Sequence, residues 1–227
     1  SRRIRRTPYT SCVEKSGITG FTVVNHTLLP KAFQHSVIED YFHLKEYVQI
    51  WDVGCQRQVK IKGPDAEFLV QKITPRDIRK TKIGQCLYIP LINGEGKIIN
   101  DPILLKIDND HFWLSIADSD ILLWVTGLSI GMGLNVKIEE PDVSPLAIQG
   151  PYSEDLMVDI FGNNIKKLKF FNFNYFDFNN TSQLIAKSGY SSQLGFEIYL
   201  NNFKLGTKLW DTICSFGKKY NLRPGAP

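Results

Sequence analysis

The stretches "VKIKGPDAEFLVQKI" (59–73) and "LAIQGPYSEDLMVDI" (146–160) carry the same pattern. Each opens with alternating apolar residues, typical of a half-buried strand, and then reaches a Gly-Pro pair. An acidic, amphipathic segment follows, and proline is well suited to the first turn of a helix. We therefore predict two strand-turn-helix units that belong to two pseudo-repeated lobes.

Strand-like runs dominate the rest of the chain. Short β-type runs separated by turn residues predict antiparallel meanders, first in "QCLYIPLI", "KIINDPILLKI" and "FWLSIA", and later in "FFNFNYFDF", "SQLIAKSG" and "GFEIYL". Helices are expected at 36–47, with a capping box of Ser36 and Glu39, at 119–130, capped by Ser119 or Asp118, and at 203–220. The fold class predicted is α+β with antiparallel sheets.

Composition and charge exclude several classes of protein. The 227 residues are 43% hydrophobic with a net charge of +4, densest in the opening "SRRIRR", which suits anionic small molecules but falls short of a nucleic-acid footprint. The 4 cysteines form no CxxC pair and have no histidine at ligand spacing, so neither disulfides nor a metal site is expected. The most apolar stretch (120–136) is too short and glycine-rich to span a bilayer. We expect a cytoplasmic protein with no nucleic-acid or membrane partner, and a homodimer is compatible with the sequence.

The stretch "NGEGKIINDPILLKI" (93–107) contains an unusual break. Asn100, Asp101 and Pro102 interrupt an apolar run, and proline cannot donate a hydrogen bond to a strand ladder. One interpretation is a bulge that turns a strand edge away, with Asp101 in solvent. The other is a carboxylate held at a strand kink, pointing into a cleft where it meets a positively charged substrate.

A second carboxylate stands out in "GFEIYL" (195–200). Residues 196, 198 and 200 share one face of this strand, while Glu197 and Tyr199 share the other. Glu197 is either a solvent-facing residue on a half-buried strand or a carboxylate that accepts two parallel hydrogen bonds. The second arrangement suits a planar amino-pyrimidine edge with adjacent N–H donors, such as a pterin.

Several motifs occur in the order found in a known family. The segments "WDVGCQRQVKIKGPDAEFLVQKITPRDI", "GQCLYIPLINGEGKIINDPIL", "WLSIADSD", "SPLAIQGP" and "SGYSSQLGFEIYL" resemble the folate-dependent aminomethyltransferases, whose best-known member is the glycine-cleavage T-protein. Stretches such as "EPDVSPLAIQGP" and "IKKLKFFNFNYFDF" are more similar to a branch that removes a methyl group from a sulfonium compound. Where the T-protein pattern reads Gly-Gly-Ile-x-Asp-Asp, this chain has Asn100 followed by Asp101.

The resemblance implies a fold and a domain organisation. Residues 1–50 with 141–227 would form one folate-binding lobe and residues 51–140 the other. Family members are longer, so a C-terminal β domain would be missing, and the chain, which starts without Met, would be a fragment.

The resemblance also implies roles for single residues. Asp101 would be the catalytic carboxylate, a partner to the cation and the folate amine. Tetrahydrofolate would be bound by Glu197, Tyr88, Ala117 and Asp118, and the sulfonium substrate by Tyr190, Trp124 and Phe171. Two departures concern the loop before Glu197, where Ser192 replaces a lysine and Leu194 a glycine of that branch.

The expected function is tetrahydrofolate-dependent methyl transfer from a sulfonium. Such a transfer expels a neutral thioether and needs no acid for its leaving group, which is consistent with asparagine at position 100. The alternatives are a glycine-cleavage-type aminomethyltransferase, an amine demethylase of the same fold, and a non-catalytic folate-binding relative in iron-sulfur assembly. The last carries a cysteine motif that "KSGYSSQLGFE" lacks. A fragment that binds folate weakly and turns over nothing is a further alternative.

Overall fold

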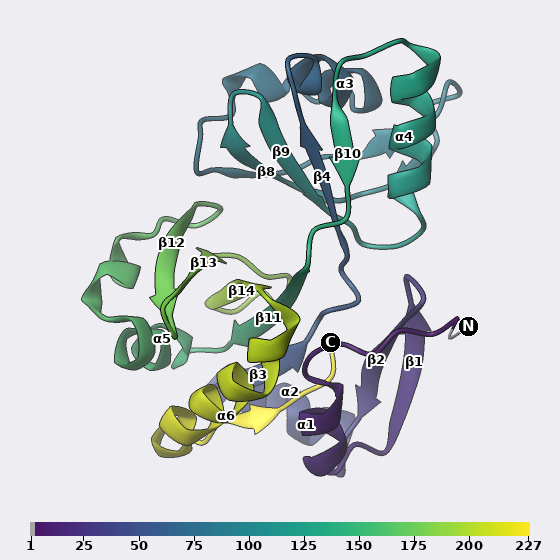
Figure 1. Cartoon of the computed structure of the whole chain (residues 1–227). Helices are drawn as coiled ribbons and strands as arrows, with labels where there is room; N and C mark the ends of the chain where they lie inside the picture. The colour runs from purple at the N-terminus through teal and green to yellow at the C-terminus, as the bar shows by residue number, and fades with distance from the viewer. Residues whose placement is uncertain (1–2) are drawn as a thin grey trace. The chain divides into compact units, whose positions relative to one another are not determined.

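The computed structural model describes residues 3–227, which form two compact units (Figure 1). The first unit comprises the chain up to Cys55 together with Asp142–Pro227, and the second comprises Gln56–Pro141. Residues 1–2 of the basic opening lie outside the described residues. The second unit is thus inserted in the sequence of the first.

The first unit is built on a sheet of 6 strands in the order β12-β13-β14-β11-β3-β15. All pairs are antiparallel except that of β15 with β3. The strands are β12 (Phe173–Phe178), β13 (Thr181–Ala186), β14 (Gly195–Asn201), β11 (Val143–Gln149), β3 (Gln49–Asp52) and β15 (Arg223–Pro224). A separate hairpin joins β1 (Gly20–Val24) to β2 (Thr27–Ala32). The helices are α1 (Thr10–Lys15), α2 (Val37–Glu46), α5 (Ser153–Phe161) and α6 (Gly206–Gly217), with the 3₁₀ turns η2 (Asn163–Lys167), η3 (Phe203–Leu205) and η4 (Lys218–Tyr220).

The second unit has an antiparallel sheet of 5 strands in the order β10-β4-β9-β8-β5 and a separate pair, β6 and β7. The strands are β10 (Lys137–Glu139), β4 (Gln58–Lys62), β9 (His111–Ser115), β8 (Ile103–Asp108), β5 (Cys86–Tyr88), β6 (Leu91–Ile92) and β7 (Ile98–Asn100). The helices are α3 (Ala66–Ile73) and α4 (Ile121–Gly131), with a 3₁₀ turn η1 (Ile78–Lys80). The α+β class with antiparallel sheets is confirmed.

The two units repeat one another in sheet order and in local geometry. The order β10-β4-β9-β8-β5 of one corresponds to β3-β11-β14-β13-β12 of the other. In each, the strand with the Gly-Pro motif is followed by a helix, and its glycine has a positive φ, +143° at Gly63 and +126° at Gly150. A Cβ on Gly63 would lie 2.6 Å from the Asn135 carbonyl oxygen, and one on Gly150 would lie 2.3 Å from that of Tyr47. In both units the backbone leading into the neighbouring strand therefore requires glycine, and the predicted pseudo-repeat is confirmed.

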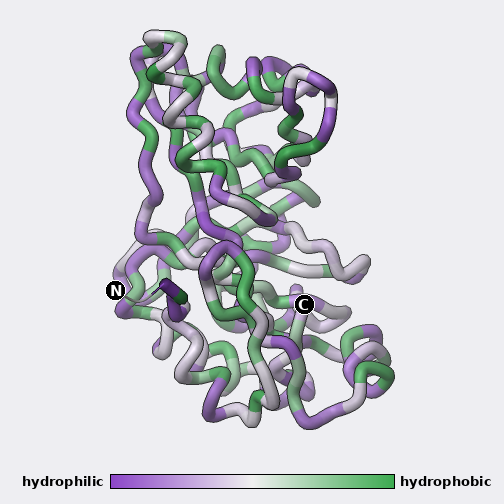
Figure 2. The backbone as a smooth tube through the Cα atoms, turned by 90° about the vertical axis from the view of Figure 1, so that its right-hand side faces the viewer, coloured by the Kyte–Doolittle hydropathy of each residue, from purple (hydrophilic) through white to green (hydrophobic). Residues whose placement is uncertain are grey.

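Each unit buries its own apolar core. Apolar and polar stretches alternate along the backbone of both units (Figure 2). In the first unit, one face of β11 and β14 packs with α5 and α6, through residues that include Leu146, Ile148, Phe196, Ile198, Leu156 and Trp210. In the second, β4 and β9 pack with α3 and α4, through residues that include Val59, Ile61, Phe112, Leu114, Leu69 and Val125. Both sheets thus have one face sealed by helices, which leaves the other face for a site.

The helix starts were predicted with mixed success. The capping box of α2 is confirmed, because the Ser36 hydroxyl accepts from the Glu39 amide at 3.2 Å and the Glu39 carboxylate accepts from the Ser36 amide at 2.8 Å. The prediction that Ser119 or Asp118 caps α4 was wrong. Asp120 caps it by accepting from the Leu123 amide at 3.3 Å, whereas Ser119 has a φ of +58° in the loop before it.

Asp52, at the end of β3, is a buried carboxylate in the first unit. It is 1% exposed and accepts hydrogen bonds from the Thr7 hydroxyl at 2.6 Å and the Gly54 amide at 3.1 Å. These bonds tie the segment before α1 to the sheet. Burial raises the pKa of Asp52 from 3.8 to about 7, although both hydrogen bonds oppose the shift.

The raised pKa of Asp52 leads us to expect that the stability of the protein depends on pH. A raised pKa means that the folded state holds its proton more tightly, so stability should fall as pH rises from about 4 to 7 and then level off. Asp52→Asn should remove this slope and be more stable than the parent at pH 8, by up to about 4 kcal/mol. Urea unfolding followed by tryptophan fluorescence at pH 5 and 8 measures this, with the exposed Asp142→Asn as control. Equal slopes in parent and Asp52→Asn would contradict the prediction.

Candidate functional site

Asp101 lies where the chain passes from one sheet to another in the second unit. β7 ends at Asn100 in its pair with β6, and β8 starts at Ile103 in its pairs with β5 and β9. The Asn-Asp-Pro break is therefore a change of strand partner. Asp101 is exposed, and its Oδ2 accepts a hydrogen bond from the Tyr88 hydroxyl at 3.2 Å. Partial burial and the Asp101 carboxylate raise the pKa of Tyr88, so the phenol stays protonated and donates.

Asn100 fixes the loop that carries Ala117 and Asp118. Its side chain is 4% exposed; the Oδ1 accepts from the Ala117 amide at 3.3 Å and the Nδ2 donates to the Ser119 hydroxyl at 3.2 Å. That hydroxyl donates in turn to the Asp118 carbonyl oxygen at 2.8 Å. Four predicted residues of the second unit thus gather around the β7–β8 break. Tyr88 bonds Asp101 directly, and Asn100, which precedes Asp101, holds the loop that carries Ala117 and Asp118. No local pattern in the sequence marks this positioning role of Asn100.

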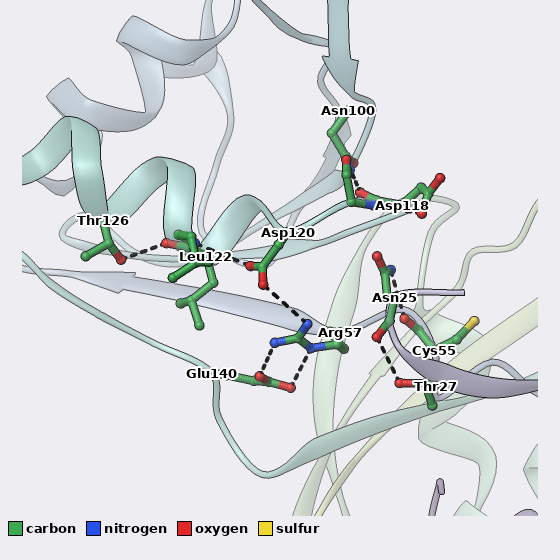
Figure 3. Close-up of polar contacts among 12 residues, drawn as sticks. Asn25, Thr27, Cys55, Arg57, Asn100, Asp118, Asp120, Leu122, Thr126 and Glu140 are labelled. Atoms are coloured by element: carbon green, nitrogen blue, oxygen red, sulfur yellow. Dashed lines mark hydrogen bonds and ion pairs between the residues drawn. The ribbon is translucent and has the colours of Figure 1, made fainter. Parts of the chain in front are cut away.

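An ion-pair cluster anchors the far end of the same loop. Arg57 is 8% exposed and donates two hydrogen bonds to Glu140, from Nε at 2.9 Å and from Nη2 at 2.5 Å (Figure 3). Its Nη1 lies 3.9 Å from the carboxylate of Asp120, the cap of α4. Arg57 lies next to the first residue of the second unit and Glu140 next to its last. The pair therefore joins the beginning and the end of this unit to each other, and Asp120 links both to the start of α4.

Glu197 is buried in the first unit. It lies on β14, between β11 and β13, and is 5% exposed, so the solvent-facing interpretation is wrong. Its Oε2 accepts a hydrogen bond from the Ser188 hydroxyl at 2.5 Å. Burial raises the pKa of Glu197, and the Ser188 hydrogen bond opposes the rise. A buried carboxylate of this kind favours a ligand that donates hydrogen bonds to it.

Small residues flank Glu197 across the sheet. Ala186 on β13 and Ala147 on β11 are its cross-strand partners and therefore share its face. The same row ends in aromatic residues, because Phe173 pairs with Ala186 and Trp51 pairs with Ala147. The side chains on either side of the carboxylate are thus small, and the row ends in a ring on each side.

The three aromatic residues predicted to bind substrate lie in different surroundings. Tyr190 is 57% exposed, and its ring lies 5.9 Å from that of Trp51. Desolvation of the phenol and the Glu197 carboxylate raise the pKa of Tyr190. Tyr190 lies two residues after Ser188, whose hydroxyl bonds Glu197. Phe171 has a φ of +55°, and its ring centroid lies 4.6 Å from that of Phe170, with the two rings tilted by 40°. Trp124 packs against the core of the second unit, an ordinary structural position.

The structure gathers the predicted residues into two groups. Tyr190 and Glu197 lie in the first unit, linked through the loop whose Ser188 bonds Glu197, and Asp101 lies with the other folate-binding candidates in the second. The use of one ligand by both groups stays a prediction, as do the substrate roles of Phe171 and Trp124. Within residues 3–227, no group of three or more His, Cys, Asp or Glu side chains could hold a metal ion. No helix of that part of the chain has the length and apolarity needed to cross a bilayer.

The chain is similar to several known proteins. A family model described as the GCVT N-terminal domain matches residues 11–226. The dimethylsulfoniopropionate demethylase DmdA of Ruegeria pomeroyi is 46% identical over 227 residues, which are 100% of this chain and 62% of that protein. An aminomethyltransferase of Thermoanaerobacter sp. is 30% identical and is matched over 86% of this chain and 54% of its own length. The chain therefore spans less than two thirds of these relatives.

Solved structures share the fold. The glycine cleavage system aminomethyltransferase T from Bartonella henselae superposes with a TM-score of 0.85 at 22% identity, covering 98% of this chain and 60% of that one. A heterotetrameric sarcosine oxidase from Corynebacterium sp. U-96 gives a TM-score of 0.61 at 13% identity, covering 95% and 96%. At such identities the likeness concerns the fold alone.

Proposed function

Because this chain belongs to the GCVT N-terminal domain family, we propose that it takes part in tetrahydrofolate-dependent demethylation of dimethylsulfoniopropionate, giving methylmercaptopropionate and 5-methyltetrahydrofolate. The identity of 46% over the whole chain to a demethylase favours this substrate over the aminomethyl reaction, for which the identity is 30%. The observation that carries the proposal is the buried Glu197 between Ala147 and Ala186.

The residues around Glu197 fit a pterin. A pterin edge offers adjacent N–H donors, and a carboxylate accepts two parallel hydrogen bonds from such an edge. Glu197 has one hydrogen bond from Ser188, and a carboxylate has about four lone-pair positions, so acceptor capacity remains. The residues on either side are alanines, whose short side chains suit a flat ring, and the row ends at Trp51 and Phe173. We propose that this row binds the pterin.

The second unit would supply the charge for methyl transfer. Tetrahydrofolate, when bound, supplies the nitrogen nucleophile that accepts the methyl group. As the S–CH₃ bond breaks, its electron pair returns to sulfur, and the thioether leaves neutral without an acid. The methylated nitrogen would then release its proton to solvent. Asp101 would face the sulfonium and the positive charge that migrates to nitrogen, and Tyr88 would orient it through their hydrogen bond. Asn100 would hold the loop of Ala117 and Asp118 beside it.

Incubation of the protein with dimethylsulfoniopropionate and tetrahydrofolate tests the proposal. We expect equal amounts of methylmercaptopropionate and 5-methyltetrahydrofolate, both followed by chromatography and mass spectrometry. Glycine-cleavage chemistry, tested with an aminomethyl-loaded lipoyl protein, should give no methylene transfer above background. Methylene transfer without sulfonium demethylation would favour the aminomethyltransferase alternative, and the absence of folate binding would contradict both.

A further inference from the structure

The loop of residues 188–194 is held by one buried side chain. Gln149, at the end of β11, is fully buried; its Nε2 donates to the Ser188 carbonyl oxygen at 3.1 Å, and its Oε1 accepts from the Ser191 hydroxyl at 2.6 Å. The next residue, Gly150, donates its amide to the Leu194 carbonyl oxygen at 2.7 Å. The loop is therefore fixed at its start, middle and end by the end of one strand.

Two glycines make room for this amide. A Cβ on Gly189 would lie 2.2 Å from the Gln149 Oε1, and a Cβ on Gly195 would lie 2.2 Å from its Nε2. Gly189 also has a φ of +141°, which side chains rarely adopt. Any side chain at either position would displace the amide, so the sequence of this loop is matched to Gln149.

Ser188 connects the amide to the carboxylate. It is 3% exposed; its carbonyl oxygen is held by Gln149, and its hydroxyl donates to Glu197 at 2.5 Å. The hydroxyl can reach the carboxylate only while the loop backbone keeps its position. Tyr190 lies two residues further along the same loop, beside Trp51.

We infer that Gln149 and Ser188 are positioning residues of the folate site: Gln149 fixes the loop, and Ser188 orients the carboxylate of Glu197 toward the pterin. This inference rests on the proposed function. Ser188 leaves the second oxygen of Glu197 to meet the ligand, and it favours the charged form that accepts two N–H bonds. Gln149 also sets where Tyr190 stands relative to that carboxylate.

The pH dependence of folate binding separates this role from a merely structural one. Within the first unit, the neighbours of Glu197 on its face are Ala147 and Ala186 across the sheet, Tyr199 along its strand, and Ser188 and Tyr190 from the loop. Loss of the Ser188 hydroxyl removes a hydrogen bond that lowers the carboxyl pKa. The pH below which folate binding fails should therefore move upward.

Calorimetric titration with tetrahydrofolate between pH 5 and 9 tests the inference. Ser188→Ala should weaken binding about tenfold or more at neutral pH and move the inflection upward, because a hydrogen bond to a charged group is lost. Ser188→Thr should restore most of the affinity, and Gln149→Glu should weaken binding since its donor to Ser188 is gone. The matched control is Gln183→Glu: Gln183 is also fully buried and bonded to backbone, but its strand partners place it on the opposite face from Glu197.

Two results would overturn the inference. One is that Ser188→Ala and Gln149→Glu bind folate as the parent does, with an unchanged inflection; the other is that Gln183→Glu loses as much affinity as they do. Failure of the proposed function looks different, because the parent itself would then not bind folate. In that case ¹³C NMR titration of the Glu197 carboxyl still tests the contact itself: a higher pKa in Ser188→Ala supports the orientation of Glu197 by Ser188, and an unchanged pKa contradicts it.

Discussion

Replacing Glu197 with glutamine is expected to weaken tetrahydrofolate binding on the order of a hundredfold or more. The carboxylate is buried, and glutamine of the same size would present an NH₂ group to the pterin where an acceptor is needed. A donor that faces donors leaves groups of both partners unpaired, and this costs more than the loss of one hydrogen bond. Calorimetry of the parent and the variant at pH 8 measures the difference.

The same variant should gain stability while it loses binding. Burial raises the pKa of Glu197 in the folded state, so the charged form destabilises the unliganded fold as pH rises above the ordinary glutamate value of 4.5. Glutamine removes that cost, and Glu197→Gln should therefore unfold at an equal or higher temperature at pH 8. The matched control is Glu154→Gln, which breaks a partly exposed ion pair with Lys187 in the same unit. Equal folate binding by Glu197→Gln and Glu154→Gln would contradict the assignment.

Asp101→Asn is expected to lower the turnover of methyl transfer by about 10²–10³-fold with little change in folate affinity. Asparagine keeps the size and an acceptor for the Tyr88 hydroxyl but has no charge to meet the sulfonium and the migrating positive charge. Losing a group that acts in the transition state lowers kcat rather than binding. Single-turnover kinetics with saturating folate and sulfonium measure it.

Tyr88→Phe serves as the comparison for Asp101→Asn. It removes the hydrogen bond to Asp101 and leaves the carboxylate, so the loss in kcat should be smaller than in Asp101→Asn. A kcat of Asp101→Asn equal to that of the parent would show that Asp101 is only a solvated residue at a change of strand partner. That was the structural interpretation of the Asn-Asp-Pro break.

Local patterns in the sequence predicted the repeated architecture well. The Gly-Pro motifs succeed because each glycine meets the backbone of a neighbouring segment, at Gly63 and at Gly150, so the requirement appears in the chain itself. The α2 capping box involves residues only three positions apart. The prediction of the α4 cap failed because three successive residues, Asp118, Ser119 and Asp120, are all of types that favour the N-cap position, and residue preference does not rank them.

The candidate site was predicted only in part, because its organisation depends on distant contacts. The alternation of residues placed Glu197 on the face opposite the apolar one. It did not predict that β11 and β13 would flank its strand on both sides. Gln149 reaches a loop 39 residues away, and no local signal in the sequence marks that contact. Asn100 was read as a replaced carboxylate, whereas its amide holds the 117–119 loop. The residue types were readable from sequence, but their partners were not.

A structure of the protein with tetrahydrofolate bound tests the central claim most directly. We predict that the Glu197 carboxylate accepts two hydrogen bonds from the pterin edge, and that Asp101 lies beside the nitrogen that receives the methyl group. The account would be contradicted if folate bound away from Glu197, or if Asp101 lay on a surface that the methyl-accepting nitrogen of the bound folate does not face.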